Sequence, residues 1–152
     1  MSEIITHIQE IQLETWNALA FEYVEQKKNH QIAFQYIEKA LKSKPNDPYY
    51  LDTKAWILVN MAEQSEDFTP SQKQNKYDEA EKLLKQCLNY CTEDDKLLKV
   101  ETLFHLGYIE KLRGRDVKAR EFFLKVLELD PQHEKAKKEL NLLKKKQAIL
   151  TS

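Results

Sequence analysis

The segment from Val100 to Pro131 constrains the fold of this chain more than any other. Its small and apolar residues recur every three or four positions in two runs, which is the period of helices that bury one face. The positions that carry the pattern are Leu103, Leu106, Gly107, Gly114, Ala119, Phe123, Leu127 and Pro131. The pattern predicts two antiparallel helices and a stop. One such pair cannot bury its apolar face alone, so we expect neighbouring pairs to stack against it.

These residues resemble the tetratricopeptide repeat (TPR) family, in which a large residue, Leu and Gly pack the first helix, Ala and Phe pack the second, and Pro ends the unit. An earlier copy ends at Pro45 and matches closely, with about one extra residue in its turn at Lys27–His30. A middle copy with Ala55 and Ala80 matches less well, because Lys54 stands where the family usually has Leu.

The resemblance implies an all-α fold, an α-solenoid of three TPR-like helix pairs in a single domain over residues 1–152. The expected units are repeat one at about 13–47, repeat two at about 48–91, repeat three at about 94–133 and a capping helix at about 134–149. Repeat two contains a polar insert at about 63–75, which we interpret as a long loop with at most an extra helical turn.

An apolar stripe precedes repeat one and forms the N-terminal helical extension of this fold. The stripe consists of Ile4, Ile5, Ile8 and Ile11. Its helical spacing is consistent with two arrangements. It either continues the first helix or folds back to cover it.

The composition favours a soluble helical protein. The chain has two glycines and four prolines, and the prolines lie between the periodic segments. Lys and Arg number 24 against 25 Asp and Glu, a net charge of -1, which gives no overall attraction to nucleic acid or to an anionic membrane. No apolar run is long enough for a membrane span, so we expect a cytoplasmic protein without a membrane partner.

In this family the first helices of successive units line a concave groove, where residues not used in packing can contact a partner. The face beside Ala20, Ala55 and Gly107 carries an aromatic residue in each unit. An exposed aromatic row with a polar rim is typical of an interaction site. The predicted groove residues are Asn17, Phe21, Tyr49, Asp52, Thr53, Trp56, Phe104, His105 and Tyr108. The alternative is that these rings pack on each other and fill the groove.

Many chaperone-binding relatives hold the terminal carboxylate of an Hsp70 or Hsp90 tail with Lys, Asn and Arg on their first, third and fifth helices. At the corresponding positions this chain has Asn17, Phe21, Thr53, Glu101 and His105. The resemblance therefore predicts that the carboxylate clamp is absent. Acidic residues near the groove favour a partner protein or peptide with apolar and basic residues instead.

The main prediction is a protein–protein interaction scaffold without enzymatic activity or a cofactor. Structural self-association into a homo-oligomer, through the isoleucine stripe or an end of the stack, is the first alternative. A nucleic-acid adaptor is the third interpretation, based on the lysines at 135–146, but no Arg cluster or interleaved aromatic residue supports it. Histidines and the pair Cys87 and Cys91 lack the spacing of a metal or catalytic site, so neither is expected.

Overall fold

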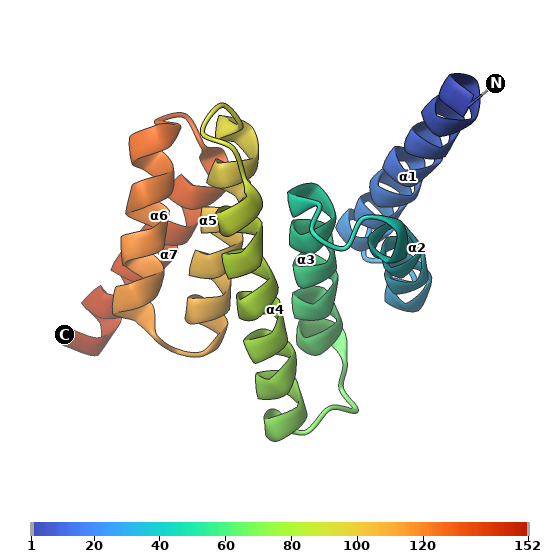
Figure 1. The fold of residues 1–152 in the computed structure, drawn as a ribbon. Coiled ribbons are helices and arrows are strands. Elements are labelled where there is room, and N and C mark those ends of the chain that lie inside the picture. The colour runs from blue at the N-terminus through green and yellow to red at the C-terminus, as the bar shows by residue number, and fades with distance from the viewer. Residues whose placement is uncertain (1, 152) are drawn as a thin grey trace. The chain divides into compact units, whose positions relative to one another are not determined.

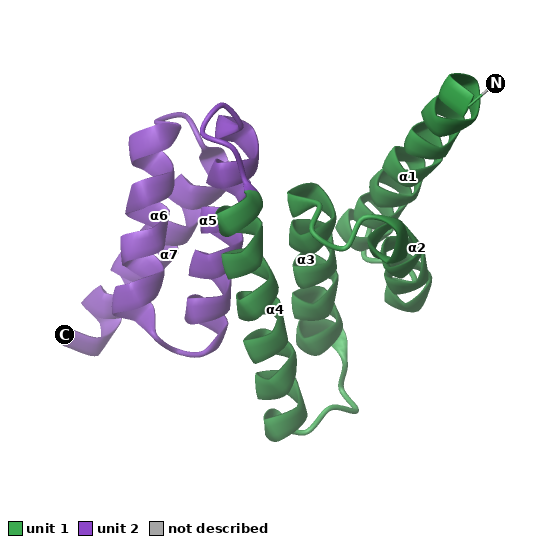
Figure 2. Ribbon diagram, viewed as in Figure 1, with its two compact units in different colours: residues 1–90 green, residues 91–152 purple. Residues whose placement is uncertain are grey.

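The computed structural model describes residues 2–151, and these residues form seven α-helices and no strand (Figure 1). The helices are α1 (Ser2–Glu25), α2 (His30–Ser43), α3 (Pro48–Gln64), α4 (Pro70–Tyr90), α5 (Lys96–Leu112), α6 (Asp116–Leu129) and α7 (Glu134–Thr151). They form two compact units, Met1–Tyr90 and Cys91–Ser152, shown in green and purple in Figure 2. The single domain expected from the sequence stays a prediction.

Unit 1 consists of α1 to α4. Helix α1 packs against α2 and α3, and α3 also packs against α2 and α4. Small residues at these crossings allow the helices to approach closely. The fully buried alanines of this unit are Ala20, Ala33, Ala40, Ala55, Ala62 and Ala80. Because α3 has three neighbours within its own unit, it is buried on most of its surface.

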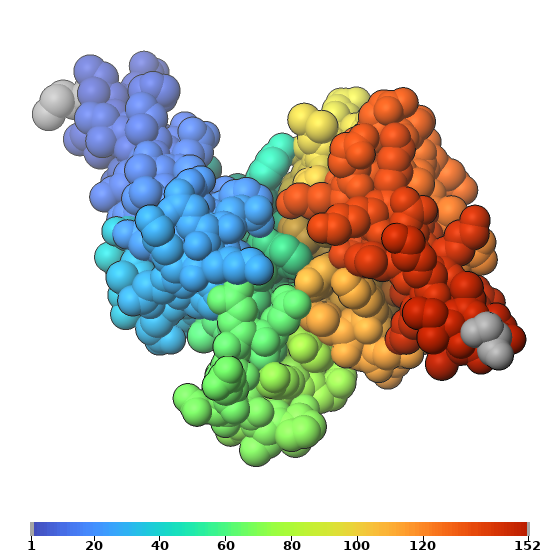
Figure 3. Space-filling model, turned by 180° about the vertical axis from the view of Figure 1, so that it is seen from behind, coloured from blue at the N-terminus to red at the C-terminus, as the bar shows by residue number. Residues whose placement is uncertain are grey.

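The N-terminal isoleucine stripe is part of α1, which runs without interruption from Ser2 to Glu25. This settles the choice that the sequence left open, because the stripe extends the first helix and does not fold back over it. All of residues 2–12 are exposed. Figure 3 shows this end of α1, in dark blue, standing clear of the rest of unit 1.

The insert expected as a loop at 63–75 is mostly helical, so that prediction is wrong. Helix α3 continues to Gln64 and α4 begins at Pro70, which leaves a connection of only residues 65–69. Thr69 and Gln72 form a capping box, since each backbone N–H donates to the other side chain, at 2.8 Å and 3.2 Å. Pro70 lies at the first helical position, where proline starts a helix and does not break one.

Unit 2 consists of α5, α6 and α7, with α6 packed against both of the others. Its core includes Phe123 and Ile109, which are fully buried. Gly107 lies against Phe123, and Gly114 ends α5 in a left-handed turn with φ +76°. The N–H of Arg115 donates to the Glu110 carbonyl at 2.9 Å and closes this turn, so glycine is required there for its backbone freedom.

Candidate functional site

The predicted groove residues of unit 1 lie on α1 and α3 and divide into exposed and buried groups. Phe21 and Tyr49 are 38% and 47% exposed, and Asn17 is half-buried. Asp52 and Thr53 are buried. The surface offered to solvent is therefore smaller than the sequence predicted.

Trp56 is only 9% exposed, so the expectation of an open aromatic side chain at this position is wrong. Its indole Nε1–H donates to the Glu25 carboxylate at 2.9 Å, which ties the middle of α3 to the end of α1. The Asn60 amide donates to the Trp56 carbonyl at 2.8 Å. The physical reason for the burial is that α3 lies between three helices, which leaves it little free face.

The expected exposure of Phe104 is also wrong, because this ring is 4% exposed in unit 2. Its centroid lies 5.5 Å from that of Phe123 and 5.3 Å from that of His133, so it belongs to the core between α5, α6 and the start of α7. His105 is buried as well. Tyr108 is half-buried and is the predicted residue of α5 that reaches solvent.

The ring of Tyr108 carries a cation on its face. The Lys111 ammonium lies 4.9 Å from the ring centroid, a cation–π contact. The same ammonium is 2.7 Å from the Glu139 carboxylate of α7. Tyr108 thus lies beside a charged pair that links α5 to α7, with a polar rim of the kind expected around an interaction residue.

The carboxylate-clamp positions contain no lysine or arginine, and the structure gives two of them other contacts. Glu101 accepts a hydrogen bond from His133 Nε2 at 3.1 Å, and His105 is buried. Glu101 is half-buried and adds negative charge to this face of α5.

His133 has a structural role that the sequence analysis did not find. It immediately precedes α7, and its Nδ1 accepts a hydrogen bond from the Ala136 backbone N–H at 3.1 Å. Its Nε2 then carries the proton that is donated to Glu101, because a neutral imidazole has one donor and one acceptor nitrogen. His133 therefore caps α7 and links it to α5.

We expect His133→Ala to destabilise the protein by about 1–2 kcal/mol, because the capped N–H of Ala136 is left without a partner in a buried position. His133→Asn should lose less than half of that, since Asn is a good capping residue. Chemical denaturation measures the free energy of unfolding of each variant, and its dependence on denaturant concentration should be the same as in the wild type. Glu101→Ala is the control, because it removes only the contact with His133 Nε2. Equal losses of stability in His133→Ala and His133→Asn would contradict the capping role.

A groove between α2, α3 and α4 was also not predicted. It has a volume of about 550 Å³ and is lined by Leu41, Pro45, Leu51, Leu83 and several polar side chains. The Lys54 ammonium lies at this groove, 2.8 Å from the Glu38 carboxylate and 3.9 Å from that of Glu79. The one sequence feature that pointed to this groove was Lys54, which departs from the leucine usual in the family. In the structure this lysine forms ion pairs that link three helices.

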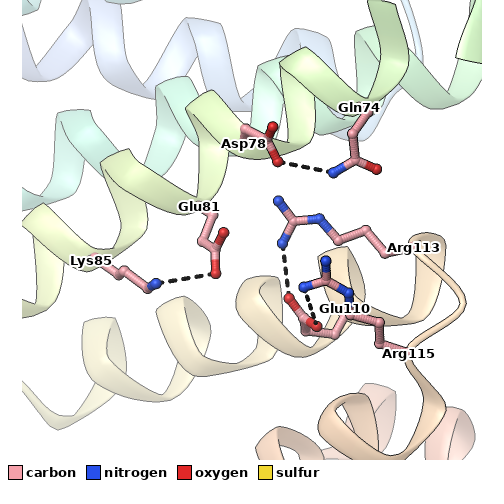
Figure 4. Close-up of polar contacts among 7 residues, drawn as sticks. All are labelled: Gln74, Asp78, Glu81, Lys85, Glu110, Arg113 and Arg115. Carbon is pink, nitrogen blue, oxygen red and sulfur yellow. Dashed lines mark hydrogen bonds and ion pairs between the residues drawn. The ribbon is translucent and has the colours of Figure 1, made fainter. Parts of the chain in front are cut away.

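Figure 4 shows further hydrogen bonds and ion pairs that lie within α4 of unit 1 or within unit 2. In unit 2 the Arg113 guanidinium lies 2.9 Å from the buried Glu110 carboxylate, and that of Arg115 lies 3.6 Å from the other carboxylate oxygen. In α4, Gln74 donates to Asp78 at 2.9 Å and Lys85 lies 3.2 Å from Glu81. The Glu110 contacts join the end of α5 to the start of α6 and so support the fold.

The described residues contain no group of three or more side chains that could hold a metal ion. Neither Cys87 nor Cys91 is part of a disulfide. Burial raises the pKa of the Cys91 thiol, and the Asp95 carboxylate raises it further, while Lys99 acts in the opposite direction. Cys91 is therefore a protonated thiol at neutral pH, which does not favour a role as a nucleophile.

Family models described as tetratricopeptide repeat match residues 13–47 and residues 71–132, which together make up more than half of the chain. The chain belongs to the tetratricopeptide repeat family. The TPR models leave residues 48–70 unmatched, in the middle copy where the sequence pattern is weakest. A comparison with curated proteins found no match.

Three solved TPR structures show the same fold. The first TPR domain of human RPAP3 has 16% identity and a TM-score of 0.67, with 90% of this chain and 93% of that one covered. The Arabidopsis OM64 TPR domain has 18% identity and a TM-score of 0.65, with 88% and 94% covered. The first TPR of Spaghetti (RPAP3), bound to the HSP90 peptide SRMEEVD, has 16% identity and a TM-score of 0.64, with 90% and 96% covered. The predicted α-solenoid of TPR-like helix pairs is confirmed by this likeness.

None of the described helices combines the length and the hydropathy that crossing a lipid bilayer would require.

Proposed function

We propose that this chain is a protein–protein interaction scaffold that binds a peptide segment of a partner protein. The observation that carries the proposal is the pair of exposed aromatic rings, Phe21 and Tyr49, on the first helices of two TPR units. Large aromatic side chains exposed on a rigid helical surface are typical anchors of an interface. The peptide bound to the Spaghetti domain supports the same use of the fold.

The proposed site lies in unit 1 and is formed by the exposed rings of Phe21 and Tyr49 with the half-buried Asn17. Tyr108 of unit 2 is proposed as a separate contact residue. Within unit 2 the buried Phe104 ring supports Tyr108, since their ring centroids lie 6.2 Å apart. Trp56, Asp52, Thr53 and His105 are buried, so in this proposal they stabilise the helices and do not contact the peptide.

The charge of the surface favours a peptide with apolar and basic residues. Glu14 is exposed on α1 and helps to raise the pKa of the Tyr50 phenol, after the larger effects of burial and of the Asp47 carboxylate. Glu25 lies at the end of the same helix against Trp56. Both carboxylates lie on α1, the helix that carries Phe21, so in this proposal a basic peptide is attracted and an acidic tail is repelled.

Peptides selected from a random display library on the wild-type protein would test the proposal. We expect the double variant Phe21→Ala and Tyr49→Ala to weaken binding of the selected peptides by at least about tenfold, since one buried aromatic anchor contributes about 2 kcal/mol. The melting temperature should stay nearly unchanged, because both rings are exposed. Fluorescence polarisation with labelled peptides measures the affinities.

Tyr90→Ala is the matched control, because Tyr90 is a similarly exposed tyrosine at the end of α4. It should leave the affinities unchanged. The peptide SRMEEVD serves as the acidic probe and should not bind at physiological salt, because no clamp lysine or arginine is present. Equal affinity in the wild type and the double variant would place the site elsewhere, and binding of SRMEEVD would refute the absence of the clamp.

A further inference from the structure

The first three turns of α1 present an apolar stripe that no other part of unit 1 covers. Ile4, Ile5, Ile8 and Ile11 are between 49% and 64% exposed. At 100° per residue they fall within one third of the helix circumference, so they form one continuous face. Four exposed isoleucines on one face are more than the scattered surface apolar residues of an ordinary domain.

The polar side of this helix end is acidic. Glu3, Glu10 and Glu14 are all exposed and lie close together in angle around the helix. The first basic residue of Lys or Arg type in the chain is Lys27. A partner surface must therefore be apolar and basic, and a second α1 end would be repelled by its like charge.

The end of α7 has the complementary composition. Leu142, Ile149 and Leu150 are between 43% and 76% exposed, and residues 144–151 are exposed throughout. This end carries three consecutive lysines, of which Lys144 and Lys145 are exposed and Lys146 lies 2.9 Å from the Asp116 carboxylate. No acidic residue occurs after Glu139.

We infer that the α1 end of one copy of the chain packs against the α7 end of a second copy. The exposed apolar residues span about two helical turns at each end, from Ile4 to Ile11 on α1 and from Leu142 to Leu150 on α7. The charged residues around them have opposite signs, and both sets of apolar residues are exposed in the single chain. The contact uses different surfaces of the two copies, so it is head-to-tail and can continue into a ring or an open chain. This self-association is independent of the peptide binding proposed above.

The contact is one helical stripe on another, at the small end of protein interfaces, so we expect reversible association that grows with concentration. Sedimentation velocity of the full chain from about 5 to about 200 μM should show the mean mass rising beyond that of a monomer. Ile8→Ser should keep the chain monomeric over this range. Leu97→Ser is the matched control, since Leu97 is an isolated and highly exposed leucine on α5, and it should associate like the wild type.

Charge reversal tests whether the α1 end of one copy binds the α7 end of another. The variant Glu3→Lys with Glu10→Lys and the variant Lys144→Glu with Lys145→Glu should each be monomeric, because each then has two ends of like charge. An equimolar mixture of the two should associate again, since each variant supplies the end that the other lacks. All four positions are exposed, so the circular dichroism melting curves should match that of the wild type.

Each possible outcome bears on the proposal. A wild type that is monomeric at every concentration would overturn it. Association that survives the lysine reversal but not the glutamate reversal would show pairing of two α1 ends, and it would overturn the head-to-tail contact. Loss in both variants with recovery in the mixture is the result that supports it.

Discussion

Phe123→Ala is expected to destabilise the protein by about 3–5 kcal/mol, the largest effect of any single truncation proposed for this chain. Phe123 is fully buried on α6, and its ring lies 5.5 Å from that of Phe104 and against Gly107. Removing the ring forfeits its burial and leaves a cavity where α5 and α6 meet. The melting temperature should fall by about 6–20 °C, as measured by circular dichroism.

The next residue along the same helix provides the control. Leu124 is 42% exposed, so Leu124→Ala should cost less than about 1 kcal/mol although it removes a comparable side chain. Phe123→Leu should retain most of the stability because much of the volume is kept. A loss for Phe123→Ala no larger than that for Leu124→Ala would show that the ring is not part of the packed core.

Gly107→Ala is expected to destabilise the protein by about 1–2 kcal/mol, against the helix preference of alanine. In the middle of a helix, alanine is favoured over glycine by about 1 kcal/mol. A Cβ atom at Gly107 would lie 2.8 Å from Phe123 Cε1 and 3.0 Å from Phe122 Cβ. The Phe123 ring is enclosed by the core and cannot withdraw, so we expect an overpacking cost in the upper part of the usual range, about 2–3 kcal/mol, which outweighs the gain.

A double-variant cycle identifies the cause. In the Phe123→Leu background the Gly107→Ala change should cost less, because the ring atom that it meets has been removed. Gly114→Ala is the control, since it is strained by its φ of +76° with nothing within 4 Å, and Phe123→Leu should not change its effect. Additive losses at Gly107 and Phe123 would contradict the steric explanation, and chemical denaturation gives each free energy of unfolding.

The helix pairs were predictable because their signals are local. Ala119 and Phe123 occur at helical spacing on α6, and the structure buries both completely. The insert was wrongly predicted because a polar composition and Pro70 resemble a loop. The capping box of Thr69 and Gln72 is a local helix-start signal, and it outweighs the polar composition of the whole segment.

The site was less predictable because exposure depends on how many helices surround each helix. The periodicity assigned Phe21 and Trp56 to equivalent faces, yet the first is 38% and the second 9% exposed. Helix α1 is at the edge of unit 1, whereas α3 has three neighbours there. Sequence spacing fixes the angle of a side chain around its helix, and tertiary packing decides what covers that angle.

The Lys54 contacts link three helices of unit 1. One ammonium group, itself largely covered, serves carboxylates on both α2 and α4. The leucine usual in the family at this position would remove the cation that links α2, α3 and α4, while Glu38 and Glu79, both about half exposed, would stay solvated. The charge at this point of α3 therefore holds neighbouring helix pairs of unit 1 to each other at a place where the family usually relies on apolar contact.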